Sequence, residues 1–166
     1  MTQRFGPDNA TLTVQTRRHG AAAKAGHDLL LIVTRWEGEL ETDDAGLPVS
    51  ASLTADSTSL RVQKGEGGMM PLGDDDKANI HQTIDDEVLK RGDIAFRSTT
   101  VEGGRVRGDL TIGSTTRPIA FDLDATGSSV AATITVTQSD FGMKPYSALF
   151  GALKVHDEVA VSLQSR

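Results

Sequence analysis

The chain of 166 residues has no cysteine and few aromatic residues, with one Trp, one Tyr and five Phe. Without cysteine the protein forms no disulfide, iron–sulfur cluster or zinc finger, and it has no thiol nucleophile. A chain of this length buries about two-thirds of its unfolded surface. We therefore expect residues 1–166 to fold as one domain without a disulfide or a metal.

Long hydrophobic runs are also missing. No stretch approaches the roughly 20 apolar residues of a membrane-spanning helix. The first ten residues contain no hydrophobic segment of a secretory signal. These two absences predict a protein with no membrane span and a cytoplasmic location.

Basic residues are in the minority, with 17 Lys and Arg against 23 Asp and Glu and a formal net charge of -6. Nucleic-acid affinity comes mostly from Lys and Arg that neutralise phosphates. We therefore expect no nucleic-acid partner, and we interpret the acidic balance as favouring solubility.

Sequence motifs of catalysis and of metal or nucleotide binding are absent. The four histidines have no HxH or HExxH spacing, no serine lies in GxSxG or SxxK, and the glycines form neither GxGxxG nor a P-loop. We therefore predict no catalytic residue, no metal ligand and no cofactor, which is more typical of a carrier or binding module than of an enzyme. An enzymatic site would need groups such as His81, His156 and Asp157 to converge.

The sequence is rich in apolar positions that alternate with polar ones. In residues 105–123, Val106, Leu110 and Ile112 share one face, and Ile119 and Phe121 continue it after a Gly/Ser/Thr turn. This pattern predicts a β-hairpin with one apolar side. Similar alternation predicts further strands within residues 11–18, 27–41, 49–62, 94–98, 130–137 and 155–163.

Two segments have helical spacing instead. Ile80, Ile84 and Val88 recur at i, i+4 and i+8 after an acidic start, which predicts a helix over residues 75–91. Tyr146 begins a similar apolar spacing that predicts a short helix over residues 145–153.

About eight strands with short connections and one main helix predict an all-β protein, an eight-stranded antiparallel barrel. The interior of such a barrel is just wide enough to be filled by side chains or to hold one small apolar ligand. Many inward positions carry Ala, Gly, Ser or Thr, which favours an underfilled interior. Tight closure on these small residues is the alternative.

Several of these segments, taken together, resemble the YceI-like family. They are residues 57–60, the helix, residues 94–98, the segments GDLTIGSTTRP (108–118) and SDFG (139–142), and a valine-rich last strand. The combination of GDLTIGSTTRP with SDFG is the specific part. The resemblance implies an extended lipocalin-like barrel whose apolar lumen holds a polyisoprenoid or fatty acyl chain, often in a homodimer.

The candidate site follows from the inward faces of the strands together with this resemblance. The expected lumen residues are Leu30, Ile32, Trp36, Phe96, Leu110, Ile112, Phe121, Ile134 and Phe141. The expected portal and lid residues are Met69, Met70, Ile80, Ile84 and Tyr146. Plain core packing and a simple connecting loop are the alternatives for these two sets.

We therefore predict non-catalytic binding of a long apolar, lipid-like molecule in the barrel. The second hypothesis is a stress-related structural or interaction protein with a closed barrel and no ligand.

Overall fold

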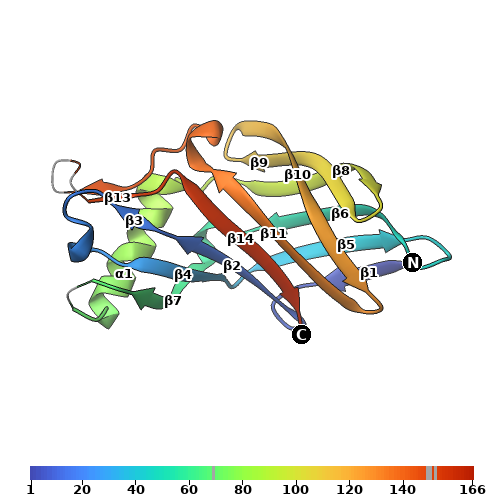
Figure 1. The fold of residues 1–166 in the computed structure, drawn as a ribbon, viewed down its shortest axis with the longest axis horizontal. Helices are drawn as coiled ribbons and strands as arrows, with labels where there is room; N and C mark the ends of the chain where they lie inside the picture. The colour runs from blue at the N-terminus through green and yellow to red at the C-terminus, as the bar shows by residue number, and fades with distance from the viewer. Residues whose placement is uncertain (69, 149–150, 152) are drawn as a thin grey trace.

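The structure is a computed structural model that describes residues 1–68, 70–148, 151 and 153–166. Within these residues, eleven antiparallel strands form one sheet in the order β1-β5-β6-β8-β9-β10-β11-β14-β2-β4-β7, and three short strands form a second sheet, β12-β13-β3. The large sheet curls into a half-barrel, with the helix α1 at one end (Figure 1). The prediction of an all-β antiparallel fold is confirmed.

The large sheet contains β1 (Thr2–Phe5), β2 (Ala10–Thr16), β4 (Asp28–Val33), β5 (Trp36–Thr42), β6 (Pro48–Ala55), β7 (Leu60–Glu66), β8 (Ile94–Glu102), β9 (Arg105–Ile112), β10 (Thr115–Thr126), β11 (Ser129–Thr137) and β14 (Glu158–Ser165). The small sheet contains β3 (Arg18–His19), β12 (Ser147–Ala148) and β13 (Leu153–Val155). The helical segments are η1 (Ala23–Ala25), η2 (Ser57–Ser59), α1 (Asp74–Thr83), the π-helical η3 (Ile84–Val88) and η4 (Gln138–Phe141).

The predicted hairpin is present as β9 and β10. Val106 lies opposite Phe121 and Leu110 lies opposite Arg117, and Val106 is completely buried. Gly108 allows β9 to approach β8 closely, because a Cβ at this position would overlap the carbonyl oxygen of Arg97. The apolar face of this hairpin is one wall of the half-barrel.

The run at residues 27–41 forms two strands, because the chain turns at Thr34 and Arg35. The N–H of Thr34 donates to the carbonyl oxygen of Ser59 at 2.9 Å, and the N–H of Arg35 donates to the Ser59 hydroxyl at 3.1 Å. The turn therefore depends on a residue far away in the sequence.

This turn changes which positions face inward. Because the two turn residues Thr34 and Arg35 separate the inward residues Val33 and Trp36, the inward residues are odd-numbered in β4 and even-numbered in β5. Leu31 and Val33 are 3% and 4% exposed, whereas Leu30 and Ile32 on the other face are only partly buried. The expectation that Leu30 and Ile32 face the lumen is wrong for this reason.

The expected count of eight strands is not confirmed. The long runs 27–41 and 49–62 each divide into two strands, at the turn after Val33 and at η2. The predicted short helix at residues 145–153 is also wrong where the structure describes it, because Ser147 pairs with Lys154 in a strand ladder. Lys154 in turn pairs with His19 of β3, so strand pairing overrides the helical spacing. Residues 149, 150 and 152 lie outside the described part.

The predicted main helix is present as α1 followed by η3. The carboxylate of Asp76 accepts a hydrogen bond from the N–H of Gly73 at the helix start, at 3.0 Å. Lys90 and Arg91 leave the helix with left-handed φ angles of 51° and 56°. No helix within the described residues is long and apolar enough to cross a membrane.

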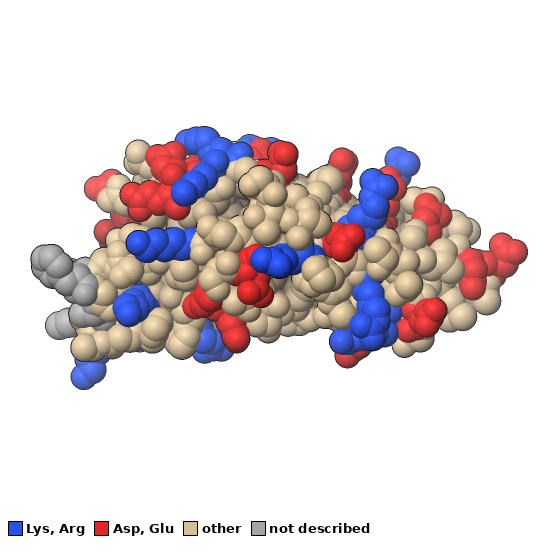
Figure 2. Space-filling view, turned by 90° about the horizontal axis from the view of Figure 1, so that it is seen from above, with Lys and Arg blue, Asp and Glu red and all other residues tan. Residues whose placement is uncertain are grey.

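Charged side chains of both signs are interspersed on the face seen in Figure 2, with uncharged surface between them. The apolar residues gather inside, in one cluster around Leu31, Trp36 and Leu60 and a second around Val106 and Leu110. Both clusters belong to the inner face of the large sheet, so the core and the interior of the half-barrel are the same region.

Replacing Gly108 with Ala tests the close approach of β8 and β9. We expect Gly108→Ala to lower the free energy of unfolding by about 1–3 kcal/mol, because the added Cβ overlaps backbone atoms. Gly38→Ala is the matched control on β5, since a Cβ there lies at 3.4 Å from the carbonyl oxygen of Ser52. Urea denaturation of both variants measures the difference, and equal losses would contradict this account.

Candidate functional site

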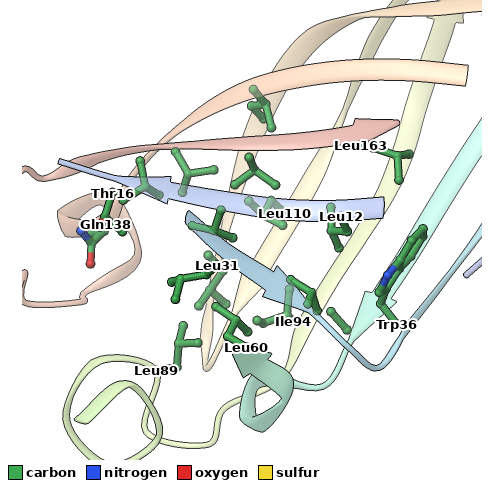
Figure 3. Close-up of a pocket in the computed structure, with 18 of the residues that line it drawn as sticks. Leu12, Thr16, Leu31, Trp36, Leu60, Leu89, Ile94, Leu110, Gln138 and Leu163 are labelled. Atoms are coloured by element: carbon green, nitrogen blue, oxygen red, sulfur yellow. The ribbon is translucent and has the colours of Figure 1, made fainter. Parts of the chain in front are cut away.

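A cavity of about 490 Å³ lies inside the half-barrel. Its wall is almost entirely apolar, and side chains from both core clusters face it (Figure 3). From the strands, the wall includes Leu12, Val14, Leu29, Leu31, Val33, Trp36, Phe96, Leu110, Ile112, Phe121, Ile134, Val161 and Leu163. From the helical segments it includes Ile80, Ile84 and Val88, with Leu89 just after them.

Six of the nine expected lumen residues lie in this wall. They are Trp36, Phe96, Leu110, Ile112, Phe121 and Ile134. Phe141 is buried, with 6% of its surface exposed, and packs in the second core cluster without lining the cavity. Leu30 and Ile32 are outside the wall because of the turn after β4.

Three of the expected portal residues, Ile80, Ile84 and Tyr146, also line the cavity. Tyr146 is 42% exposed, which places it at the surface end of the wall. Met70 is 75% exposed and does not line the cavity. Its carbonyl oxygen lies 2.6 Å from Nε2 of His27. Met69 lies outside the described residues.

Sequence reasoning missed the β4 residues Leu29, Leu31 and Val33. Residues 29–33 are all apolar, so alternation carries no information about which of them face inward. It also missed the polar wall residues Thr16 and Gln138, which no sequence motif marks.

Polar contacts hold α1 and η3 against η2, at the end of the cavity. Nε2 of His81 lies 3.0 Å from the carbonyl oxygen of Thr58 and 3.1 Å from Oδ2 of Asp85. Nη1 of Arg61 donates to the same Thr58 oxygen at 2.8 Å. These contacts keep the apolar side of the helix, including Ile84, turned toward the cavity.

Asp56 fixes the conformation of η2 itself. Its Oδ1 accepts hydrogen bonds from the hydroxyl and the N–H of Thr58 at 2.7 and 2.8 Å, and its Oδ2 accepts one from Nε of Arg35 at 2.9 Å. These hydrogen bonds lower the pKa of Asp56 to about 2. The bond from the Thr58 hydroxyl has the largest effect, followed by the bonds from the Thr58 N–H and from Arg35.

The family assignment follows from a comparison with known protein families. The model of the YceI-like domain matches residues 7–166. The chain belongs to the YceI-like family. This family is known for a lipocalin-like, polyisoprenoid-binding fold, and its members are generally binding proteins and not enzymes.

Solved structures agree with the fold of this YceI-like chain. BcnA of Burkholderia cenocepacia is 14% identical, with a TM-score of 0.62 over 94% of each chain. A mutant CJ YceI protein made for nanotechnology applications is 12% identical, with a TM-score of 0.57 over 82% of this chain and 84% of that one. A second mutant of the CJ YceI protein, solved with monobromobimane as a guest, is 13% identical with a TM-score of 0.55 over the same shares. No protein of curated function matches the chain.

The groups that an enzymatic site would need have separate partners in this YceI-like chain. His81 contacts Asp85, His156 stacks on His19 with 4.2 Å between ring centroids, and Asp157 accepts a hydrogen bond from the N–H of Ser139. Within the described residues, no group of three or more His, Cys, Asp or Glu side chains is placed to hold a metal ion.

Asp56→Asn tests the contribution of the Asp56 charge to stability. Because the folded-state pKa of Asp56 is lowered from 3.8 to about 2, its charge stabilises the fold above pH 3.8, and this contribution is lost as the pH falls toward 2. We expect the variant to be less stable than the wild type at pH 6 and the difference to shrink below pH 4.

Urea denaturation between pH 6 and pH 3 measures this change. Asp44→Asn, at an exposed turn position, is the matched control and should show no such trend. A stability difference for Asp56→Asn that stays constant across this range would contradict the prediction.

Proposed function

We propose that this YceI-like protein binds a long, largely apolar molecule of the polyisoprenoid or fatty acyl type, non-covalently and without catalysis. The observation that carries the proposal is the apolar cavity of about 490 Å³ inside the half-barrel. Its size falls within the range of small-molecule sites in proteins. Residues 1–166 act together as one binding unit.

The apolar wall is sufficient for affinity. Burial of each CH₂ group contributes about 0.8 kcal/mol, so a chain that buries ten such groups gains about 8 kcal/mol before the costs of association. Arg18, a polar residue of the wall, is occupied by other contacts, since its Nη1 lies 3.3 Å from Oδ1 of Asp28 and donates to the carbonyl oxygen of Glu66 at 2.9 Å. Ligand binding therefore needs no ion pair with this residue.

A closed barrel without a ligand is less consistent with the burial of the inward residues. Ile112, Phe121 and Ile134 point into the half-barrel, yet each is only partly buried. In a core filled by side chains, such residues would be fully enclosed. Their partial exposure supports a cavity that a ligand enters.

Extraction of the purified protein tests the proposal directly. We expect organic extraction followed by mass spectrometry to release a lipid in a ratio of about one per protein chain. The delipidated protein should then bind farnesol or palmitic acid in isothermal titration. The proposal fails if no lipid is released and neither compound binds.

A lysine in the wall tests where binding occurs. We expect Ile134→Lys to weaken binding of farnesol by about tenfold or more, because a charge in an apolar cavity opposes the burial of a hydrocarbon chain. Thr135→Lys is the matched control, since the next residue of β11 is exposed on the other face. Circular dichroism verifies that both variants fold, and equal affinities for the two variants would contradict a binding site in the cavity.

A further inference from the structure

Two polar atoms in the cavity wall have no hydrogen-bond partner. Among the described residues, the buried side-chain atoms without a partner are Oγ1 of Thr16, Nε1 of Trp36 and Oδ1 of Asp85. Thr16 and Trp36 line the cavity, whereas Asp85 does not. Since an unpaired buried polar group is costly to stability, its presence in a wall that is otherwise apolar needs an explanation.

Packing fixes the orientation of Trp36. The residue is 7% exposed, and the far edge of its six-membered ring lies over Gly38, with Cζ3 at 3.6 Å from the position of a Cβ there. Figure 3 shows Trp36 at one end of the cavity, with its nitrogen on the side turned toward the other wall residues.

The surroundings of Trp36 offer no partner for its N–H. An indole N–H only donates hydrogen bonds, so its partner must carry an acceptor atom. The side chains that form this cluster with Trp36, such as Leu12 and Val33, are apolar. A molecule bound in the cavity beside Trp36 can supply this acceptor.

Thr16 differs from Trp36 in place and chemistry. It lies at the other end of the cavity, beside Gln138 (Figure 3). Nε2 of Gln138 is already used, since it donates to the carbonyl oxygen of His156 at 3.0 Å. A threonine hydroxyl can rotate and can both donate and accept hydrogen bonds. It therefore restricts the chemistry of the ligand less than the indole N–H, which has a fixed direction and only donates.

We infer that Trp36 is a specificity-determining residue whose indole N–H donates a hydrogen bond to an oxygen atom of the bound molecule. The ligand is then an oxygenated lipid with a carbonyl, ether or hydroxyl oxygen that reaches the Trp36 end of the cavity, and not a bare hydrocarbon chain. This inference rests on the proposed function, because it requires the cavity to be the binding site. A site with a fixed polar group discriminates against analogues that leave the group unpaired.

The test compares dodecane with 2-dodecanone, which adds an acceptor oxygen and no donor. The affinities of the delipidated wild type and of Trp36→Phe for both probes are measured by calorimetry. The cost of removing each probe from water is the same for both proteins, so it cancels when the ketone-to-alkane affinity ratios are compared. We expect the ratio to fall about tenfold in Trp36→Phe, the effect of one hydrogen bond.

Two control variants locate the effect. Thr16→Val removes the other unpaired polar atom with little change of shape, and Phe121→Leu alters the wall without touching a polar group. Both should keep the wild-type ratio. A change of the ratio in Thr16→Val in place of Trp36→Phe would put the acceptor at the opposite end and overturn the inference.

The chain has a single Trp, which allows a second measurement on the wild type alone. This measurement needs no variant, so it does not depend on whether Trp36→Phe folds. Its indole N–H gives one cross-peak in a ¹H–¹⁵N spectrum of the wild type. We expect 2-dodecanone to move this peak strongly downfield and dodecane to move it little.

The outcomes separate the two proposals. If both probes bind with the same ratio in wild type and Trp36→Phe, and the indole peak responds equally to both, the inference is wrong while the proposed function stands. If neither probe binds the wild type, and farnesol and palmitic acid do not bind it either, the proposed function fails and the inference falls with it. If farnesol or palmitic acid binds but 2-dodecanone does not, the inference is wrong while the proposed function stands.

Discussion

One curled sheet must bury its apolar face, although its side chains have too little volume to fill the space that it encloses. The rest of the structure depends on this constraint. Aromatic residues make up only 4% of the chain. Removal of the inner face from water drives the curling, yet native interiors are close-packed. The large sheet removes its inner face from bulk water but does not close-pack the space inside. The cavity of about 490 Å³ is the result.

Much of the fold could be predicted from local patterns in the sequence. The β9–β10 hairpin was predictable because Val106 and Phe121 belong to clean alternations on either side of a short turn. The inward face of β4 was not, because its phase is set by hydrogen bonds from Thr34 and Arg35 to the distant Ser59. In the same way, β12 and β13 form through pairing with residues far apart in the sequence, which local helical spacing does not reveal.

In the candidate site, too, local sequence patterns predicted some features, whereas features that depend on distant residues were not predictable. Apolar wall residues such as Leu110 and Ile134 follow from periodicity, because a residue that faces inward in a half-barrel also faces the cavity. Whether a polar atom has a partner depends on all of its neighbours in space, so the unpaired N–H of Trp36 becomes apparent only in the folded protein. The helix is an intermediate case: its apolar spacing was visible, but its attachment through His81 to the carbonyl of Thr58 was not.

The order of the strands leaves β1 and β7 as the two edges of the large sheet within the described residues. Exposed backbone edges promote pairing between chains, and charged side chains at an edge oppose it. Arg4 of β1 contacts Glu39 at 3.4 Å, and Lys64 and Glu66 of β7 lie 2.6 Å apart. The charged side chains on β1 and β7 therefore oppose pairing of these open edges with strands of other chains. The half-barrel can stay open at its edges and is still protected against aggregation through them.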